Sequence, residues 1–268
     1  MRLAHRLAVL TAAATCVLIV FGGLVTNTGA ALAVPDWPTT FGHNMFLFPW
    51  SGMVGGVFYE HSHRLLGALV GLLTLALALA LWGRGGRLRA LGLLAVAAVV
   101  LQGVIGGLRV VLLTDALAMV HGPLAQAFFA LVVAIALVTS TRMARPAPAV
   151  DGVTRGLSLA SAALVFVLVP MVTARLRRTG DPVAAPASRL LLLLLGLQLA
   201  LGIGSYLSRF SGVWIPGGQL TMLVLPVTHR LAGGLILAAA VVLAVRVLTA
   251  ARPAPSTVSA HGALRVAQ

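Results

Sequence analysis

The sequence predicts an all-α polytopic membrane protein of seven or eight transmembrane helices, arranged in two helical-bundle halves with the second half shortened. Three observations predict this fold class. The 268-residue chain is 60% hydrophobic and 9% charged, and its mean hydropathy is +1.05. Apolar runs of about 18 residues or more recur, and each can cross a hydrocarbon core of roughly 30 Å. Sequence motifs of the first half return in the second half.

This composition excludes an ordinary soluble domain and a disordered chain. The net charge of +14 does not indicate a nucleic-acid partner, because the arginines lie in short loops between apolar runs, as the positive-inside rule expects. We therefore expect a multi-pass protein of a bacterial cytoplasmic (inner) membrane. The single cysteine, Cys16, excludes an intrachain disulfide and a cysteine-rich metal site.

Seven apolar runs are the candidate spans. They cover residues 7–26, 59–82, 90–113, 116–140, 156–174, 190–207 and 220–248. Arginine counts place the loops on both sides of the run 156–174 in the cytoplasm. About 19 residues cannot cross a bilayer twice, so either this run is re-entrant or interfacial, or the second half is inverted against the charge rule.

The same features divide the chain into four parts. We expect a first four-helix half over residues 1–145, a cytoplasmic linker over 146–155, a shortened second half over 156–250, and a cytoplasmic or disordered tail over 251–268.

An internal repeat supports two pseudo-symmetric halves. The run His63-Arg64-Leu65-Leu66-Gly67-Ala68-Leu69 returns as His229-Arg230-Leu231-Ala232-Gly233-Gly234-Leu235, and Leu101-Gln102 with Gly106 returns as Leu197-Gln198 with Gly202. Repeats within a membrane chain usually place the working site inside or between the repeated units.

Polar groups gather at the start of the second apolar run. On a helix, Glu60, His63, Arg64 and Gly67 share one face, whereas His61 points away from it. We expect His61 and His43 to be solvated or interfacial residues. Ionisable groups within a membrane span are functional candidates by default, because burying them there is costly.

Three histidines, His63, His121 and His229, lie near the starts of long apolar runs. Two imidazoles that face each other across a helical bundle are a standard way to hold haem iron. A lone intramembrane histidine more often bonds a neighbouring helix, but three at matched positions favour ligands. Zinc is disfavoured, because cysteine is lacking as a ligand and acids are few. Gly67 would let a porphyrin lie flat, together with the glycines at 106 and 107.

Glu60 is the only glutamate in the chain. It is either a salt-bridge partner of Arg64, which would contribute little, or an acid/base or charge-stabilising group one helical turn from an iron ligand, and its position favours the second. Arg109 either snorkels to the membrane surface or pairs with a haem propionate. The sequence Asp36-Trp37-Pro38 is either a turn with an interfacial anchor or part of a lid.

Several of these motifs together resemble the haem A synthase family. They are Gly22-Gly23-Leu24-Val25-Thr26-Asn27-Thr28-Gly29, Val34-Pro35-Asp36-Trp37-Pro38, Glu60-His61-Ser62-His63-Arg64, Gln102-Gly103-x-x-Gly106-Gly107 and His121. The last two apolar runs also resemble the closing pair of helices of that family, with His229 as the matching histidine. The resemblance implies eight transmembrane helices in two four-helix halves. It also implies conversion of the C8 methyl of haem O to a formyl group, which gives haem A for cytochrome oxidase.

The resemblance further implies that His63 and His121 flank the substrate haem, with Glu60 beside it, and that two histidines hold a haem b in the second half. This chain departs from that pattern, because no histidine lies between Gly122 and Thr228. The partners implied are haem O and haem A, the lipid bilayer, haem O synthase, oxidase assembly factors and an electron donor.

The first hypothesis is therefore an oxidoreductase of haem A synthesis, in which Glu60, His63 and His121 act on a haem methyl group. The alternative is a non-catalytic haem-binding membrane protein, such as a haem carrier or an accessory of oxidase assembly. A membrane cytochrome that only passes electrons is a third reading. Glu60 discriminates between them, because neither a carrier nor a cytochrome needs it.

Overall fold

The computed structural model describes residues 1–141, 143, 149–160, 172–176, 178–210 and 217–250. Within these residues the regular structure is helical, apart from one isolated bridge between Thr40 and His43. The α-helices are α1 (Arg2–Asn27), α2 (Gly56–Trp82), α3 (Gly86–Leu112), α4 (Asp115–Val138), α5 (Gly152–Ala160), α7 (Ala184–Phe210) and α8 (Gly218–Thr249). Two short 3-10 helices, η1 (Met45–Leu47) and η2 (Trp50–Gly52), lie in the long α1–α2 connection.

Six of the described helices are long and apolar enough to cross a membrane, namely α1, α2, α3, α4, α7 and α8. The prediction of an all-α polytopic membrane protein is confirmed. The proposed run 156–174 falls largely on residues outside the described part of the chain, as do the tail 251–268 and most of residues 142–148.

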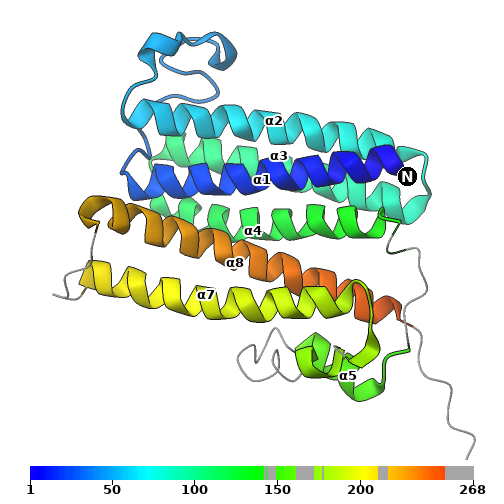
Figure 1. Ribbon diagram of the computed structural model, residues 1–268. Coiled ribbons are helices and arrows are strands. Elements are labelled where there is room, and N and C mark those ends of the chain that lie inside the picture. The colour runs from blue at the N-terminus through cyan, green and yellow to red at the C-terminus, as the bar shows by residue number, and fades with distance from the viewer. Residues whose placement is uncertain (142, 144–148, 161–171, 177, 211–216, 251–268) are drawn as a thin grey trace, which may run out of the picture.

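The first four helices form one bundle, in which α1 contacts α2 and α4, and α3 contacts α2 and α4. Helix α8 packs on α1 and α4, and α7 packs on α8 at the outside of the assembly (Figure 1). Small residues allow these close approaches. A Cβ atom added at Gly23 of α1 would lie 3.3 Å from Val227 of α8, so the two parts meet with little space between them.

Both ends of the bundle can be followed in Figure 1. The N-terminus, the α2–α3 connection and the end of α4 lie at one end, and the long α1–α2 connection lies at the other. Helix α7 begins at the end where α4 finishes, so α7 and α8 keep the orientation that the arginine distribution predicts. The described parts of the α4–α7 connection begin and finish on one side of the bundle, which does not support an inverted second half.

A buried ion pair fixes this end of the second half. Asp181 caps the start of α7 by accepting hydrogen bonds from the backbone N–H groups of Val183 and Ala184, at 2.8 and 2.7 Å. Its carboxylate also lies 3.1 Å from Nε of Arg246 near the end of α8, and both side chains are 2% exposed. Removing either partner would leave a buried charge uncompensated, so the pair specifies how α7 and α8 align.

Candidate functional site

The structure brings two of the predicted histidines together inside the first four-helix bundle. The rings of His63 on α2 and His121 on α4 have centroids 6.5 Å apart, and their planes are inclined by 73°. Both Nδ1 atoms are buried and, among the described residues, have no hydrogen-bond partner. Buried polar atoms without partners are rare in folded proteins, and each requires an explanation such as a missing ligand.

The separation of the rings fits an iron atom between them. A histidine nitrogen binds a first-row metal at about 2.0–2.1 Å, and an imidazole nitrogen lies about 1.1 Å from its ring centre, which places two axial imidazoles about 6.4 Å apart between centroids. The described residues hold no group of three or more His, Cys, Asp or Glu side chains arranged to bind a metal ion. A two-histidine haem site fits this donor set better than a zinc site.

Each of these histidines lies against a glycine of a neighbouring helix. A Cβ atom added at Gly22 of α1 would lie 3.1 Å from Cε1 of His63, and one added at Gly106 of α3 would lie 3.3 Å from Cε1 of His121. The amide of Gln102 also donates to the backbone carbonyl of His121 at 3.2 Å. The glycine contacts lie along the Cε1 and Nδ1 edge of each ring, so the two glycines limit where the imidazoles can sit.

The three glycines that were expected to leave room for a porphyrin differ in what they contact. Gly67 faces open space on the His63 side of α2, as predicted. Gly106 instead provides the seat of His121, and Gly107 is covered by the indole of Trp37. The two α3 glycines therefore allow an imidazole and an indole, and not a porphyrin, to approach the helix.

Arg64 ties the long α1–α2 connection to α2. Its guanidinium donates to the backbone carbonyls of Asp36 at 2.7 Å, Thr39 at 3.0 Å and Val34 at 3.0 Å. It also pairs with the Glu60 carboxylate at 2.8 Å. The planar fork of arginine suits such a set of divergent acceptors, which a lysine could not satisfy together. Sequence reasoning placed Arg64 on the functional face but missed this role, which depends on loop carbonyls that no motif marks.

Glu60 lies inside the same arrangement and is 5% exposed. One carboxylate oxygen accepts from Arg64, and the other accepts the backbone N–H of Val34 at 3.0 Å. The salt bridge considered for the sequence is therefore present, but it is buried and not a weak surface pair. Glu60 stands one helical turn from His63, so a structural role and a role in chemistry are both compatible with its position.

The turn that begins at Asp36 shapes the connection above the site. Asp36 accepts hydrogen bonds from the backbone N–H groups of Phe41 and Gly42, at 2.7 and 2.9 Å, and from the Thr39 hydroxyl. Burial alone would raise the pKa of Asp36, but these hydrogen bonds outweigh it and lower the pKa to about 2. With Trp37 packed on Gly107, the segment is both a turn and a cover over the outer end of α3.

The expectation for His61 was wrong. Its side chain is 1% exposed, its Nδ1 lies 3.0 Å from the Thr40 hydroxyl, and its ring lies 5.1 Å from the ring of Phe48. The α1–α2 connection folds back over the start of α2 and buries the side of the helix that was expected to be solvated. His43 is exposed, as predicted.

Arg109 lies in the last turn of α3. Its positive charge lies within electrostatic range of both His63 and His121. Its pairing with a haem propionate stays a prediction.

His229 on α8 lies apart from the first pair and meets Gln198 of α7. The Gln198 amide nitrogen is 3.2 Å from Nε2 of His229, and a Cβ atom added at Gly202 would lie 3.2 Å from Cε1 of the same ring. The predicted match of Gln102 and Gly106 with Gln198 and Gly202 is visible in space, because Gly202 contacts His229 as Gly106 contacts His121. In space His229 therefore corresponds to His121, and not to His63, its counterpart in the other predicted repeat motif. His229 has no facing imidazole, because the second half contains no other histidine before residue 250. These residues do not fit a haem held by two histidines.

Comparison with known proteins gives one relevant similarity. A stretch of 110 residues is 34% identical to heme A synthase from Shouchella clausii (strain KSM-K16), and it takes in 40% of this chain and 35% of the length of that protein. The chain thus matches about a third of the length of this curated relative. No family model and no solved structure matches the chain. Over part of its length, this multi-pass membrane protein therefore has a haem A synthase-like relationship.

Proposed function

We propose that this protein is a haem A synthase-like oxidoreductase that converts the C8 methyl of haem O to a formyl group in a bacterial cytoplasmic membrane. The observation that carries the proposal is the pair His63–His121, whose ring separation of 6.5 Å suits axial ligation of a haem iron. The partial similarity to heme A synthase supports the same substrate class.

His63 and His121 would hold the substrate haem through its iron and orient the ring in the bundle. Gly22 and Gly106 lie close to the edges of the two imidazoles, so the rings have little room to shift toward α1 and α3. Arg109 supplies a positive charge within electrostatic range of the pair, which suits a propionate of the substrate.

Glu60 is the proposed catalytic carboxylate. Arg64 and the Val34 N–H hold its charge in a fixed position one turn from His63, where it can stabilise positive charge that develops at the methyl carbon or accept a proton. The methyl group loses electrons and protons during this oxidation and gains an oxygen atom from water. The electrons leave to an acceptor outside this chain, and haem O synthase and oxidase assembly factors are the further partners that the proposal implies.

The test is haem analysis of membranes. The chain is co-expressed with a source of haem O in a host that makes no haem A, and the extracted haems are separated by chromatography with mass detection. We expect haem A, or its hydroxylated intermediate, with the unaltered chain, and haem O alone with Glu60→Gln. The His63→Ala and His121→Ala variants should lose bound haem.

Two other outcomes of the haem analysis would contradict the proposed function or the proposed role of Glu60. Haem O that co-purifies without any oxidised product would assign the chain to haem carriage or oxidase assembly. Haem A output from Glu60→Gln equal to that of the unaltered chain would remove Glu60 from the chemistry and leave it as a structural anchor.

A further inference from the structure

The middle of the α1–α2 connection is apolar and exposed. No Asp, Glu, Lys or Arg lies between Asp36 and Glu60. Within this stretch, the exposed fraction is 65% for Phe46, 79% for Leu47 and 80% for Trp50. Large apolar side chains that gather on a surface in this way mark a contact with a membrane or with another protein.

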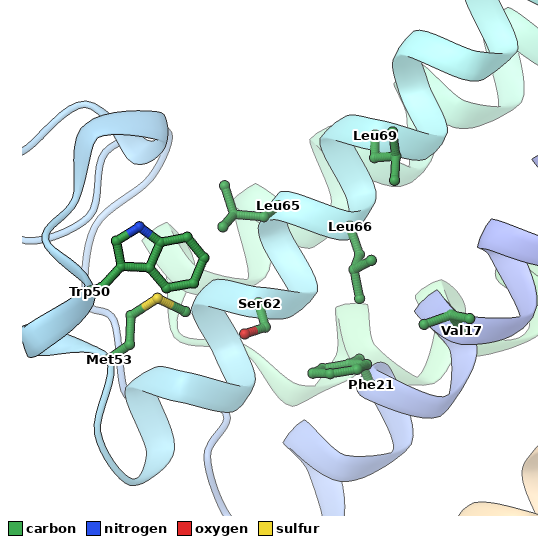
Figure 2. Close-up of a pocket in the computed structure, with 8 residues that line it drawn as sticks. All are labelled: Val17, Phe21, Trp50, Met53, Ser62, Leu65, Leu66 and Leu69. Atoms are coloured by element: carbon green, nitrogen blue, oxygen red, sulfur yellow. The ribbon is translucent and has the colours of Figure 1, made fainter.

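The connection lies at the periphery of the bundle. Figure 1 shows it beside one end of α2, away from α7 and α8, and η1 contacts α2. Its apolar surface continues onto the helices, because Trp50 and Met53 of the connection line a shallow apolar depression together with Leu65 and Leu69 of α2 and Phe21 of α1 (Figure 2). Both helices are long and apolar enough to span a membrane, so the connection extends a surface that faces lipid.

Arg64 indicates the depth of the connection in the bilayer. Helix α2 has 27 residues and is therefore about 40 Å long, close to the thickness of the hydrocarbon core plus both headgroup regions. Arg64 lies about 12 Å along the helix from Gly56, and its side chain leans back toward that end. Its guanidinium thus lies near the boundary between headgroups and hydrocarbon. Because it binds the backbone carbonyls of Val34, Asp36 and Thr39, this part of the connection lies at the same depth.

Side chains satisfy the backbone of the connection at this depth. Non-helical backbone at the edge of a membrane needs hydrogen-bond partners from the protein, because hydrocarbon provides none. Arg64 serves three carbonyls, Glu60 accepts the backbone N–H of Val34, and Asp36 accepts two further backbone N–H groups of the connection. The segment is therefore equipped to lie beside lipid.

We propose that the α1–α2 connection is an interfacial element that inserts Phe46, Leu47 and Trp50 into the outer leaflet, the leaflet opposite the arginine-rich turns. Aromatic side chains are enriched where a protein crosses the membrane–water interface. A protein-binding patch has a polar rim around its apolar centre, whereas this surface continues onto the lipid-facing sides of α1 and α2. The inference does not depend on the proposed function.

Spin labels measure the depth of the connection. Cys16→Ala removes the single cysteine of the full chain, and a nitroxide is attached at Leu47→Cys or Trp50→Cys in liposomes of phosphatidylcholine and phosphatidylglycerol. Oxygen concentrates in hydrocarbon and a nickel chelate stays in water, so power-saturation EPR with each reagent reports what surrounds the label. We expect a ratio of oxygen to nickel collisions several-fold higher than at Arg84→Cys, an exposed position of the α2–α3 turn. The ratio should approach that at Leu72→Cys, a 63% exposed position within the α2 span.

The label at Leu72→Cys also shows that the chain is inserted in the bilayer. Nickel collisions at both connection labels as frequent as at Arg84→Cys would overturn the insertion and leave the surface for a partner protein in water. Rare collisions with both reagents at Leu47→Cys and Trp50→Cys, with oxygen still reaching Leu72→Cys, would also overturn it and assign the surface to a contact between copies of this chain.

Discussion

At the scale of single residues, glycine decides where each intramembrane histidine lies. Gly22, Gly106 and Gly202 each receive the Cε1 edge of a histidine from a neighbouring helix, with added Cβ distances of 3.1 to 3.3 Å. These distances are tighter than ordinary van der Waals contact, so any larger side chain would require the imidazole to shift by a few tenths of an ångström or more. A helix-interior glycine is otherwise less stable than alanine by roughly 0.5–1 kcal/mol.

Gly22→Leu should therefore displace the His63 ring and weaken haem binding. A leucine at this position cannot share the space of the imidazole, so we expect the affinity for haem B to fall at least about tenfold, as measured by titration of the low-spin absorption band. Gly196→Leu is the matched control, because an added Cβ atom at Gly196 of α7 meets nothing within 4 Å. An unchanged titration for Gly22→Leu would show that the ring is not positioned by this contact.

Asp36 provides a prediction about pH. Its pKa is lowered from 3.8 to about 2 in the folded protein, so the ionised carboxylate is the form that stabilises the turn. That contribution is fully present above about pH 4 and is lost as the pH falls through about 2. Fluorescence of Trp37, with the other tryptophans replaced by phenylalanine, should stay constant from pH 7 to about 4 and change below that. In Asp36→Asn the change should be absent, and a transition near pH 6 instead would point to a histidine.

At the scale of elements, the α1–α2 connection is held by one turn of α2. Arg64 donates to three loop carbonyls and to Glu60, while His61 lies beside the Thr40 hydroxyl. The connection thus becomes part of the folded bundle and not a loose loop. The same turn carries His63, the proposed haem ligand, so the connection and this ligand are attached to one turn of α2.

Arg64→Lys should loosen the connection without removing the positive charge. An ammonium group cannot reach the acceptors that the guanidinium fork reaches, and hydrogen bonds to charged groups contribute roughly 1.5–3 kcal/mol each. We expect faster cleavage by chymotrypsin within residues 41–54, where Phe46 and Leu47 are exposed, and a lower Tm in detergent. Arg84→Lys, an exposed position of the α2–α3 turn, should behave like the unaltered chain. Equal cleavage rates for the two variants would contradict the role of Arg64.

At the scale of the whole molecule, the two halves share an arrangement of glutamine, glycine and histidine, but the described second half does not contain a pair of histidines. In the first half, Gln102 and Gly106 lie on α3 and His121 lies on α4. In the second half, Gln198 and Gly202 lie on α7 and His229 lies on α8. The first half adds α1 and α2, and with them His63. In the described second half, Nε2 of His229 meets the Gln198 amide, its Nδ1 is buried without a hydrogen-bond partner like those of His63 and His121, and no second imidazole faces it.

We therefore expect the bound haem, and so the haem spectrum, to depend on the histidines of the first half. His229→Ala should leave the haem-to-protein ratio and the low-spin spectrum nearly unchanged, whereas His121→Ala should remove most of the bound haem. The measurement is pyridine haemochrome analysis against protein concentration for the purified variants. Loss of about half of the haem in His229→Ala would show that the second half holds a haem with a different second ligand.

The sequence alone determined the class of protein and the candidate chemistry. Apolar length identifies a membrane helix without knowledge of its neighbours, because the bilayer sets the required length. All six spans that the structure describes agree with the predicted runs to within six residues at each end. The helical periodicity likewise placed Glu60, His63 and Arg64 on one face.

Only the tertiary structure decided how these residues are used. The pairing of His63 with His121, the seats at Gly22 and Gly106, and the cover of Trp37 over Gly107 all join segments far apart in the chain. So do the burial of His61 under the connection and the bond of Gln198 to His229. Such contacts depend on how helices approach one another, and helix packing in a membrane is set by the shape of small and large side chains on facing helices. A linear pattern indicates which face of a helix is special, but it does not indicate what that face meets.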